Sequence, residues 1–434
     1  MTGVPMTGSS SGVFLRWALM LAAAAVAVWG FVRVPGQAGD LPVLPGLEPD
    51  PYAVCPVAQA GGGFSSRVGV SRQQDGQISV IGAGGGEGVV AADGGAFFTE
   101  VGEMAELGTT PLLVETAGAA AIYTRAGTVA AMSGCIPASA GPLAVMGMST
   151  AEGDASTMVL VNPFASEALV RLVGASEFGV DTPTELEEVT VPAATTVEVV
   201  LDRAMAGRQN LSIAVVADSG LLTAGMNRTG PGDVASLEAV SGGTRWFFPL
   251  PDFGFDGEIH IRSLVDVEGP YRIDRIQPDG IVEGVLEGVL AAQSLAVIPV
   301  EGVAGPGSGI VISAAESVAA AVVYAVDDVR AVAPGLSRES TRWLAPVSAI
   351  LDEGQATVWI LNTSGEALTG RIERPGAPAA SGQSVDLPAG MTTGAFVAGA
   401  TGGAIEVSAD GPIVVFYGVL SGNSIGLGAA VPVE

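Results

Sequence analysis

Short runs of apolar residues recur along most of the chain, and many of them end at proline, glycine or asparagine. In residues 189–201 the apolar side chains fall on alternate positions, on either side of the pair Pro192-Ala193. A period of two is typical of a β-strand with one buried face, and the proline interrupts that strand. The pattern therefore predicts many short strands and turns rather than long helices.

One hexapeptide occurs twice. Residues 244–249 read Thr-Arg-Trp-Phe-Phe-Pro, and residues 341–346 read Thr-Arg-Trp-Leu-Ala-Pro. Their tryptophans, Trp246 and Trp343, are 343 − 246 = 97 residues apart, close to the roughly 100 residues of one immunoglobulin-like sandwich. Because each tryptophan opens a repeated segment, we expect both to be unit junctions, with the ring packed between one unit and the next.

Other sequence features recur at about twice the 97-residue spacing of the two tryptophans. Asn162 and Asn362 each follow an apolar run and are 362 − 162 = 200 residues apart, while Pro192 and Pro388 each stop a strand and are 388 − 192 = 196 residues apart. A third copy is expected between them, with Asp266 near the position of the asparagine and residues 297–299 at the proline stop. A fourth and weaker copy precedes them.

These repeats predict an all-β fold of tandem immunoglobulin-like β-sandwich units. The four units are expected at residues 52–134, 135–243, 244–340 and 341–434. A β-propeller with two blades per unit is the alternative, since one blade takes roughly 40–50 residues.

The longest apolar run lies near the N-terminus, where residues 17–32 carry no charge between Arg16 and Arg33. With residues 13–15 the run reaches about 20 residues, enough to cross a bilayer. We expect a cytoplasmic tail at 1–12, a transmembrane helix acting as a signal anchor at 13–32, and a proline-rich stalk at 33–51. A signal peptide cleaved near residues 36–38 is the alternative, and both interpretations export the rest of the chain to the outer side of the cell membrane.

Charge limits the partners. The 434 residues include 45 acidic and 18 basic side chains, all of the latter arginine, for a formal net charge of −27. Such a chain repels a phosphate backbone, which excludes nucleic acid as a partner. The lack of lysine also excludes a phosphate-loop lysine and a Schiff base.

The two cysteines stand at comparable places. Cys55-Pro56 enters the first expected unit, and Cys135-Ile136-Pro137 enters the second. Because an exported chain with two cysteines usually joins them, we predict a disulfide between Cys55 and Cys135. It would close a loop of 135 − 55 = 80 residues, which is worth about 4–5 kcal/mol in the chain-entropy model.

Together these marks resemble a family of actinobacterial envelope proteins of unknown function. The resemblance covers most of residues 52–425 and rests on Asn162-Pro163, Pro192-Ala193, the tryptophan-proline junctions and the single N-terminal anchor. Asn362 and Pro388-Ala389 match the same features of this family in part. It implies export, membrane anchoring and a β-rich extracellular region in a high-GC Gram-positive bacterium, and it supplies no catalytic residue.

Candidate chemistry is sparse. One histidine and two cysteines are too few for a zinc, copper or iron site, so no metal, cofactor or catalytic residue is predicted. His260 lies between Ile259 and Ile261, and the period of two points it toward solvent. The glycine-rich run at 82–88 is interpreted as a hairpin loop and not as a phosphate cradle, because no helix follows it.

Two weaker signals concern polar turns. Acidic residues at Asp252, Asp256, Glu258 and Asp327-Asp328 are interpreted as solvated turns, with calcium between units as the alternative. The glycosylation sequons at Asn210, Asn227 and Asn362 are expected to be chance matches in a bacterial chain.

We therefore expect a non-catalytic, membrane-tethered scaffold or binding ectodomain of the cell envelope, with an envelope protein or a glycan as its partner. A glycoside hydrolase acting on the cell wall or another polysaccharide is one alternative. It would require two carboxylates about 5–10 Å apart in an aromatic-lined cleft. A calcium-dependent carbohydrate-binding module is the other alternative.

Overall fold

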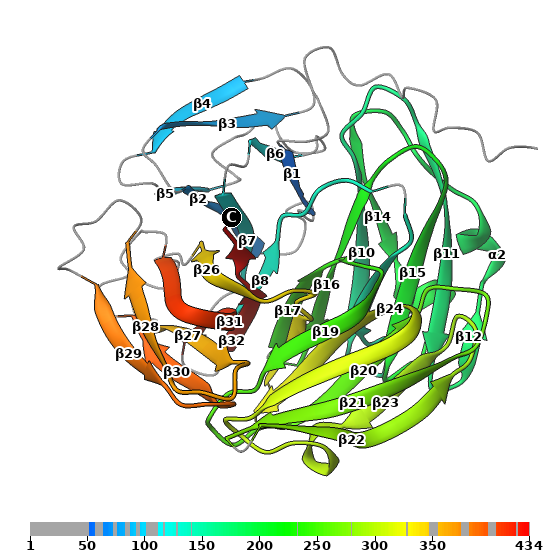
Figure 1. Cartoon of the computed structure of the whole chain (residues 1–434). Coiled ribbons are helices and arrows are strands. Elements are labelled where there is room, and N and C mark those ends of the chain that lie inside the picture. The colour runs from blue at the N-terminus through cyan, green and yellow to red at the C-terminus, as the bar shows by residue number, and fades with distance from the viewer. Residues whose placement is uncertain are drawn as a thin grey trace, which may run out of the picture. The chain divides into compact units, whose positions relative to one another are not determined.

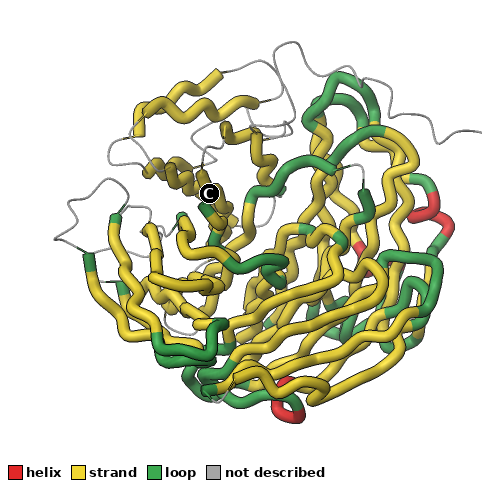
Figure 2. The backbone as a smooth tube through the Cα atoms, in the orientation of Figure 1, coloured by secondary structure: helices red, strands yellow, loops and turns green. Residues whose placement is uncertain are grey.

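A computed structural model describes most of the chain after residue 51. The described segments are residues 52–56, 64–72, 76–82, 87–92, 96–100, 112–115, 118–126, 129–139, 141–231, 233–278, 280–326, 329–346, 355–374, 382–397, 405–421 and 424–433. The expected tail, anchor and stalk lie outside them. In the described segments, no helix has both the length and the hydropathy that a membrane span requires. Strands make up most of these segments, which confirms the predicted all-β class, and their helices are short (Figure 2).

The strands follow one another in four sets (Figure 1). The first set holds β1 (Tyr52–Cys55), β2 (Phe64–Arg72), β3 (Gly76–Gly82), β4 (Glu87–Ala92), β5 (Ala96–Glu100), β6 (Leu112–Glu115), β7 (Gly118–Ala126) and β8 (Val129–Gly134). The second holds β9 (Leu143–Met148), β10 (Ala155–Asn162), β11 (Ala168–Ser176), β12 (Gly179–Asp181), α2 (Thr184–Glu187), β13 (Val189–Val191), β14 (Thr195–Val200), α3 (Leu201–Ala204), β15 (Leu211–Ser219), β16 (Thr223–Gly230), β17 (Asp233–Glu238) and β18 (Val240–Ser241).

The other two sets follow the same order. The third holds β19 (Gly243–Pro249), β20 (Asp256–Ser263), β21 (Gly269–Gln277), β22 (Gly280–Leu290), β23 (Leu295–Pro299), the 3-10 turn η3 (Val300–Gly302), β24 (Gly309–Val326) and β25 (Val329–Pro334). The fourth holds β26 (Ser340–Ala345), β27 (Gln355–Asn362), β28 (Leu368–Glu373), β29 (Gln383–Leu387), β30 (Thr392–Phe396), β31 (Ile405–Ser421), β32 (Ser424–Ala429) and β33 (Val431–Pro432).

Strand pairing is antiparallel and has the same order in every set. One group of paired strands is β4-β3-β6-β1 in the first set, β13-β11-β15-β9 in the second, β22-β21-β24-β19 in the third and β29-β28-β31-β26 in the fourth. The other is β5-β2-β7-β8, β14-β10-β16-β17, β23-β20-β24-β25 and β30-β27-β31-β32. In the last two sets a single long strand, β24 or β31, belongs to both groups.

The chain that leaves each set first returns to that set's opening strand. Ile136 forms a bridge with Val54 of β1, and Leu336 forms one with Phe247 of β19. In the second set β18 pairs with β9, and in the fourth β33 pairs with β26. Each set is therefore closed by its own exit segment.

The strand at the end of the second group in each set, β8, β17, β25 or β32, contacts the corresponding strand of two other sets. β8 contacts β17, β17 contacts β25, β25 contacts β32, and β32 contacts β8. The glycines Gly426 and Gly428 of β32 lie against Met132 of β8, where they leave room for the methionine side chain. The contacts therefore form a closed cycle in which the fourth set meets the first.

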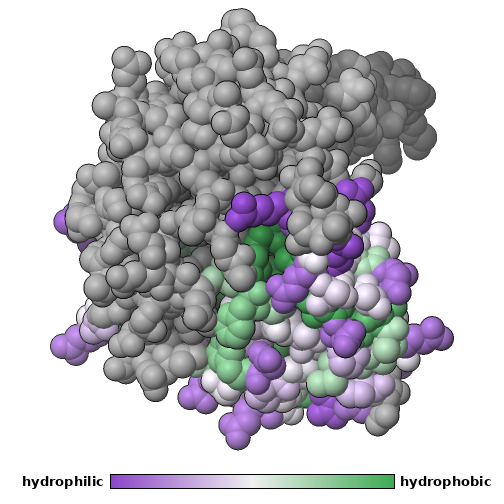
Figure 3. All heavy atoms as spheres, turned by 90° about the vertical axis from the view of Figure 1, so that its left-hand side faces the viewer, coloured by the Kyte–Doolittle hydropathy of each residue, from purple (hydrophilic) through white to green (hydrophobic). Residues whose placement is uncertain are grey.

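Burial on both strand faces is common in this arrangement. Met158, Val159, Leu160 and Val161 of β10 are all fully buried, as their continuous apolar run predicts. Among the described residues, exposed large apolar side chains come from separate places, such as Phe178 in the turn between β11 and β12, Val289 in β22 and Phe396 in β30. Among the coloured residues of Figure 3, hydrophobic and hydrophilic side chains lie next to one another.

Asn162 and Asn362 have the same local role. The Asn162 side-chain amide donates to the carbonyls of Ser166 and Val191 at 2.7 and 3.0 Å. That of Asn362 donates to the carbonyls of Glu366 and Leu387 at the same two distances. Each asparagine thus connects the turn after its own strand to a strand of the set's other group of paired strands. This shared role explains why the asparagine recurs in the sequence.

The expected third copy of these marks is wrong in detail. In the third set the place of the asparagine is taken by Ser263, the last residue of β20, and not by Asp266. The Ser263 N–H donates to the Ser294 carbonyl at 2.9 Å. In the fourth set the Asn362 N–H makes the equivalent hydrogen bond, to the Met391 carbonyl at 3.0 Å. Pro299 ends β23 instead of stopping the preceding strand. Without an asparagine or a proline, the equivalent turn had no sequence signal.

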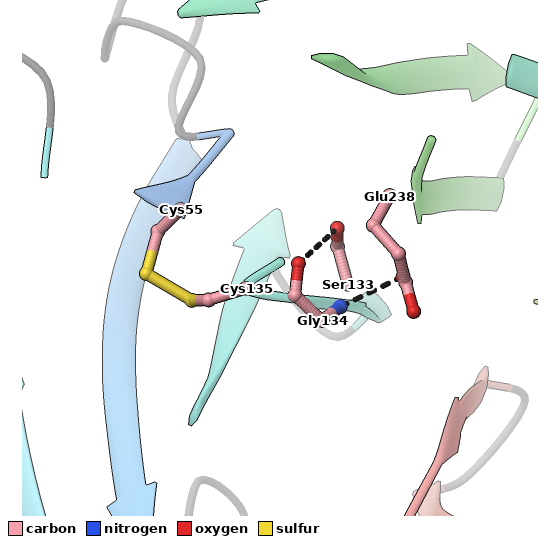
Figure 4. Close-up of a disulfide and its surroundings, with 5 residues drawn as sticks. All are labelled: Cys55, Ser133, Gly134, Cys135 and Glu238. Atoms are coloured by element: carbon pink, nitrogen blue, oxygen red, sulfur yellow. Dashed lines mark hydrogen bonds between the residues drawn. A yellow bond between two sulfur atoms is a disulfide. The ribbon is translucent and has the colours of Figure 1, made fainter. Parts of the chain in front are cut away.

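The predicted disulfide is present and closes the first set (Figure 4). Beside it, the Val54 N–H donates to the Ile136 carbonyl at 2.8 Å, and the Ile136 N–H donates to the Val54 carbonyl at 3.1 Å. By strand pairing, Cys135 therefore belongs with the first set and does not open the second. The glycine-rich run at 82–88 joins β3 to β4, which pair as a hairpin, and residues 83–86 lie outside the described segments.

Trp246 and Trp343 are both buried. The Trp246 indole N–H donates to the Val318 carbonyl at 3.1 Å, and the Trp343 indole N–H donates to the Ile413 carbonyl at 3.0 Å. Val318 and Ile413 are the residues at which the long strands β24 and β31 change pairing partners. These hydrogen bonds lie within one set, and a junction role for the rings stays a prediction.

Different aromatic side chains meet across the boundary between the third and fourth sets. The rings of Phe253 and Trp359 are 6.1 Å apart, and those of Phe248 and Phe416 are 6.4 Å apart, both in edge-to-face geometry. Such pairs add about 0.5–1.5 kcal/mol beyond the burial of their surface. Trp359 lies in the repeated apolar run that precedes Asn362, but nothing in that run marked it as a contact between two sets.

Candidate functional site

A cleft of about 460 Å³ lies between the second and third sets. Four carboxylates and one guanidinium line it: Asp154, Asp256, Glu258, Glu301 and Arg330. The amides of Gln209 and Asn210, the Ser149 hydroxyl and the Phe255 ring complete most of the polar and aromatic lining. The mixture supplies donors, acceptors and one ring to a small polar molecule.

Strand register builds the wall from the third set. Glu258 of β20 lies opposite Pro299 of β23 on one side and Val323 of β24 on the other. One step along the same face, Asp256 lies opposite Ala325, which in turn lies opposite Arg330 of β25. Directly opposed residues in antiparallel strands share a face, so these side chains converge.

Glu177 fixes the loop of the second set that faces this wall. Its carboxylate accepts the N–H groups of Gln209 and Asn210 at 2.8 and 3.2 Å. Burial alone would raise the pKa of Glu177, but these N–H groups, its own backbone N–H and Arg208 together lower it. The two side-chain amides are thereby held at the rim of the cleft.

A buried ion pair lies beside the cleft. Arg228 donates to Asp233, and a second carboxylate, that of Asp154, is 4.0 Å away. Burial lowers the pKa of Arg228 and raises that of Asp233, and in each case it outweighs the attraction of the partner. The backbone of Arg330 also favours the charged form of Asp233, which links the third set to the second.

The expectation that His260 faces solvent is wrong. Its side chain is 1 % exposed instead of facing solvent, and its Nε2 lies 3.4 Å from Glu258 Oε2. The period of two does place it opposite Ile259 and Ile261, but the second set covers that face as well. The contact with His260 is the main reason why the pKa of Glu258 is lowered, against the opposing effect of burial.

A second buried carboxyl lies near the disulfide (Figure 4). Glu238 of β17 accepts the Gly134 N–H at 2.7 Å, at the contact between the second and first sets. Burial raises its pKa, and the hydrogen bonds from Gly134 and Ser133 offset that effect only in part. Glu238 is not part of the cleft lining, and its hydrogen bond with Gly134 joins the second set to the first.

The acidic residues that the sequence suggested as turns lie in different parts of the structure. Asp256 and Glu258 line the cleft. Asp252 lies near Gly394 of the fourth set, and Asp327-Asp328 falls outside the described residues. In the part of the chain that the structure describes, no three His, Cys, Asp or Glu side chains gather as a metal site would require.

The cleft was not predictable from the sequence. Its residues come from two repeats, and no periodicity indicates which loop of one set faces which strand of the next. Among the three sequons, Asn362 is fully buried and Asn210 lines the cleft. Of the lining residues, the sequence singled out only Asp256 and Glu258, as an acidic turn, and Asn210, as a sequon.

Comparison with known families adds one match. Residues 110–236 match a family of unknown function (DUF5719), a span that runs from the end of the first set through most of the second. No curated protein matches the chain. The similarity supports an uncharacterised family and assigns no activity.

Proposed function

We propose that this chain is a non-catalytic binding or scaffold ectodomain of a bacterial cell envelope, tethered to the membrane through residues 13–32. The cleft between the second and third sets carries the proposal. Its ligand would be a small polar part of an envelope glycan, because hydroxyl groups match the carboxylate, amide and guanidinium groups around it.

We also propose that each strand set is one immunoglobulin-like β-sandwich unit. In support, each set forms two groups of four paired strands, and neither group pairs its strands in chain order. A propeller blade is built from consecutive strands, so the pairing disfavours that alternative. Small-angle scattering of a single-set fragment provides the test, since a blade alone would not remain compact.

Glu258 does not fit the role of the general acid in a glycoside hydrolase. A glycosidase needs a carboxylic acid that stays protonated, and hence one with a raised pKa. Glu258 has a lowered pKa instead, because of its contact with His260. An ionised Glu258 accepts hydrogen bonds from a sugar but donates none.

A glycan array followed by calorimetry tests the binding proposal. We expect envelope polysaccharide fragments to bind the intact protein, and Arg330→Ala and Asn210→Ala each to weaken binding by about 1–3 kcal/mol through an unpaired ligand group. Arg203→Ala, at an exposed residue of α3 outside the cleft, is the matched control. Equal loss in the control, or release of new reducing ends from the bound glycan, would contradict the proposal.

Export has its own test. The Cys55–Cys135 disulfide supports an oxidising location, because such bonds rarely persist in a bacterial cytosol. In cell fractionation, the full chain should remain in the membrane and be digested by protease added outside. Deletion of residues 1–32 should leave it in the cytosol with reduced cysteines.

A further inference from the structure

Phe178 presents an aromatic ring to solvent. It lies in the turn between β11 and β12, and its side chain is 69 % exposed. The guanidinium carbon of Arg208 lies over the ring, 4.7 Å from its centre, and covers one face. Most of the exposed surface therefore belongs to the opposite face, which is a flat apolar surface open to a ligand.

Hydrogen bonds fix the backbone on both sides of this contact. The Arg208 N–H donates to Thr150 Oγ1 at 3.1 Å, and the Arg208 carbonyl accepts the Thr150 N–H at 2.8 Å. The Phe178 N–H donates to Ser176 Oγ at 3.3 Å. Asp181, 3.5 Å from Arg208 Nη2, draws the guanidinium to its place over the ring. A ligand would meet a ring that is already held in position, so little ordering would oppose its binding.

The ring adjoins the cleft between the second and third sets. Glu177, the residue before Phe178, accepts the N–H groups of Gln209 and Asn210. Both of these residues line the cleft, and Arg208 immediately precedes them in the chain. The aromatic ring and its arginine therefore lie directly outside the rim of the cleft, on the side of the second set.

The cleft and the ring favour different parts of one kind of ligand. Four of the five charged side chains that line the cleft are carboxylates, which repel an acidic sugar and accept hydrogen bonds from hydroxyl groups. The ring offers only apolar surface. A neutral pyranose with equatorial hydroxyls has polar edges and faces made of C–H groups, so it can bind a polar cleft by its edge or an aromatic ring by its face.

We propose that Phe178 is a stacking surface for the second sugar of a neutral β-linked oligosaccharide whose first sugar occupies the cleft. This inference rests on the proposed function and extends its site to at least two sugars. The ring adds affinity only when the ligand reaches beyond the rim, so the gain depends on the length of the glycan.

Calorimetry with N-acetylglucosamine and its β-linked oligomers of two and four sugars tests the length dependence. We expect the wild type to bind the oligomers more tightly than the single sugar. Phe178→Ala should lower the ratio of oligomer affinity to single-sugar affinity roughly 3–10-fold, and Phe178→Trp should retain it. Phe396→Ala removes a ring of similar exposure, 62 %, from the fourth set, and it should bind every probe as the wild type does.

Nuclear magnetic resonance gives a readout that a merely structural role of Phe178 would not move. The C–H protons of a stacked sugar lie over the ring, so they should shift upfield when the oligomer binds the wild type. With Phe178→Ala that upfield shift should be absent.

The outcomes separate this inference from the proposed function. An unchanged affinity ratio in Phe178→Ala, with weaker binding in Asn210→Ala, would overturn the stacking surface and leave the cleft as the binding site. Equal losses for the single sugar and the oligomers would also overturn it, because the ring would then act only through the rim of the cleft. Binding of another glycan but of none of these oligomers would overturn this inference alone, and binding of no glycan would overturn both.

Discussion

Ala194 occupies a backbone conformation that glycine would adopt more easily. It has φ of +51°, Gln293 has +52° and Gly390 has +63°, and the three residues hold the same place in the turns of the second, third and fourth sets. Of these three residues, only Gly390 is a glycine. Ala194→Gly should therefore stabilise the protein.

The magnitude follows from two opposing effects. An L-residue in the left-handed region costs about 1–2 kcal/mol, which glycine relieves. Glycine also gives the unfolded chain more freedom, which costs about 0.4–1 kcal/mol. We expect a net gain of about 0.5–1 kcal/mol, and a similar gain for Gln293→Gly.

Gly390→Ala should act in the opposite direction and more strongly. An added Cβ would lie 1.9 Å from the Gln277 carbonyl oxygen in the third set. The backbone would have to move, and overpacking of this kind adds about 1–3 kcal/mol to the strain of the positive φ.

Urea unfolding of residues 43–434, followed by tryptophan fluorescence, measures these changes. Ala193→Gly is the matched control, because Ala193 has no positive φ and should lose about 0.4–1 kcal/mol. If Ala194→Gly destabilises as much as Ala193→Gly, the backbone strain inferred at this turn is wrong.

Three other outcomes are expected. Arg228→Met or Asp233→Asn alone should lower the free energy of unfolding by about 3–5 kcal/mol. The double variant Arg228→Met/Asp233→Leu should lower it by less, because neither buried charge is then left without its partner. Additive losses of unfolding free energy in urea would contradict the pairing. The raised pKa of Glu238 means that the folded state holds a proton the unfolded state has lost, so stability should fall as pH rises from the ordinary range of a glutamate to the folded pKa. Glu238→Gln should remove that fall, and an unchanged pH profile would refute the assignment. Reduction of Cys55–Cys135 should destabilise the first set by about 4–5 kcal/mol, which limited proteolysis would detect as early cleavage within residues 52–134; unchanged resistance would show that noncovalent contacts suffice.

Local features of this fold were readable from the sequence, and contacts between repeats were not. Asn162 and Asn362 recur because a side-chain amide at that position satisfies carbonyls of its own set, a requirement that each repeat meets alone. His260 was misplaced because alternation reports two faces of a strand but not what covers the second one. The cleft depends on Arg330 and Asn210, which meet only when two sets pack, and such packing leaves no period in the chain.

The contact cycle of β8, β17, β25 and β32 has a consequence for how such a chain can evolve. An open row of repeats can gain or lose a member at its end, because the new terminal repeat needs only one neighbour. In a closed cycle, each set has two neighbours, and a fifth copy would have to change every contact angle. Duplication or loss of one repeat is therefore disfavoured, and relatives of this protein should vary in loop length while they keep four sets.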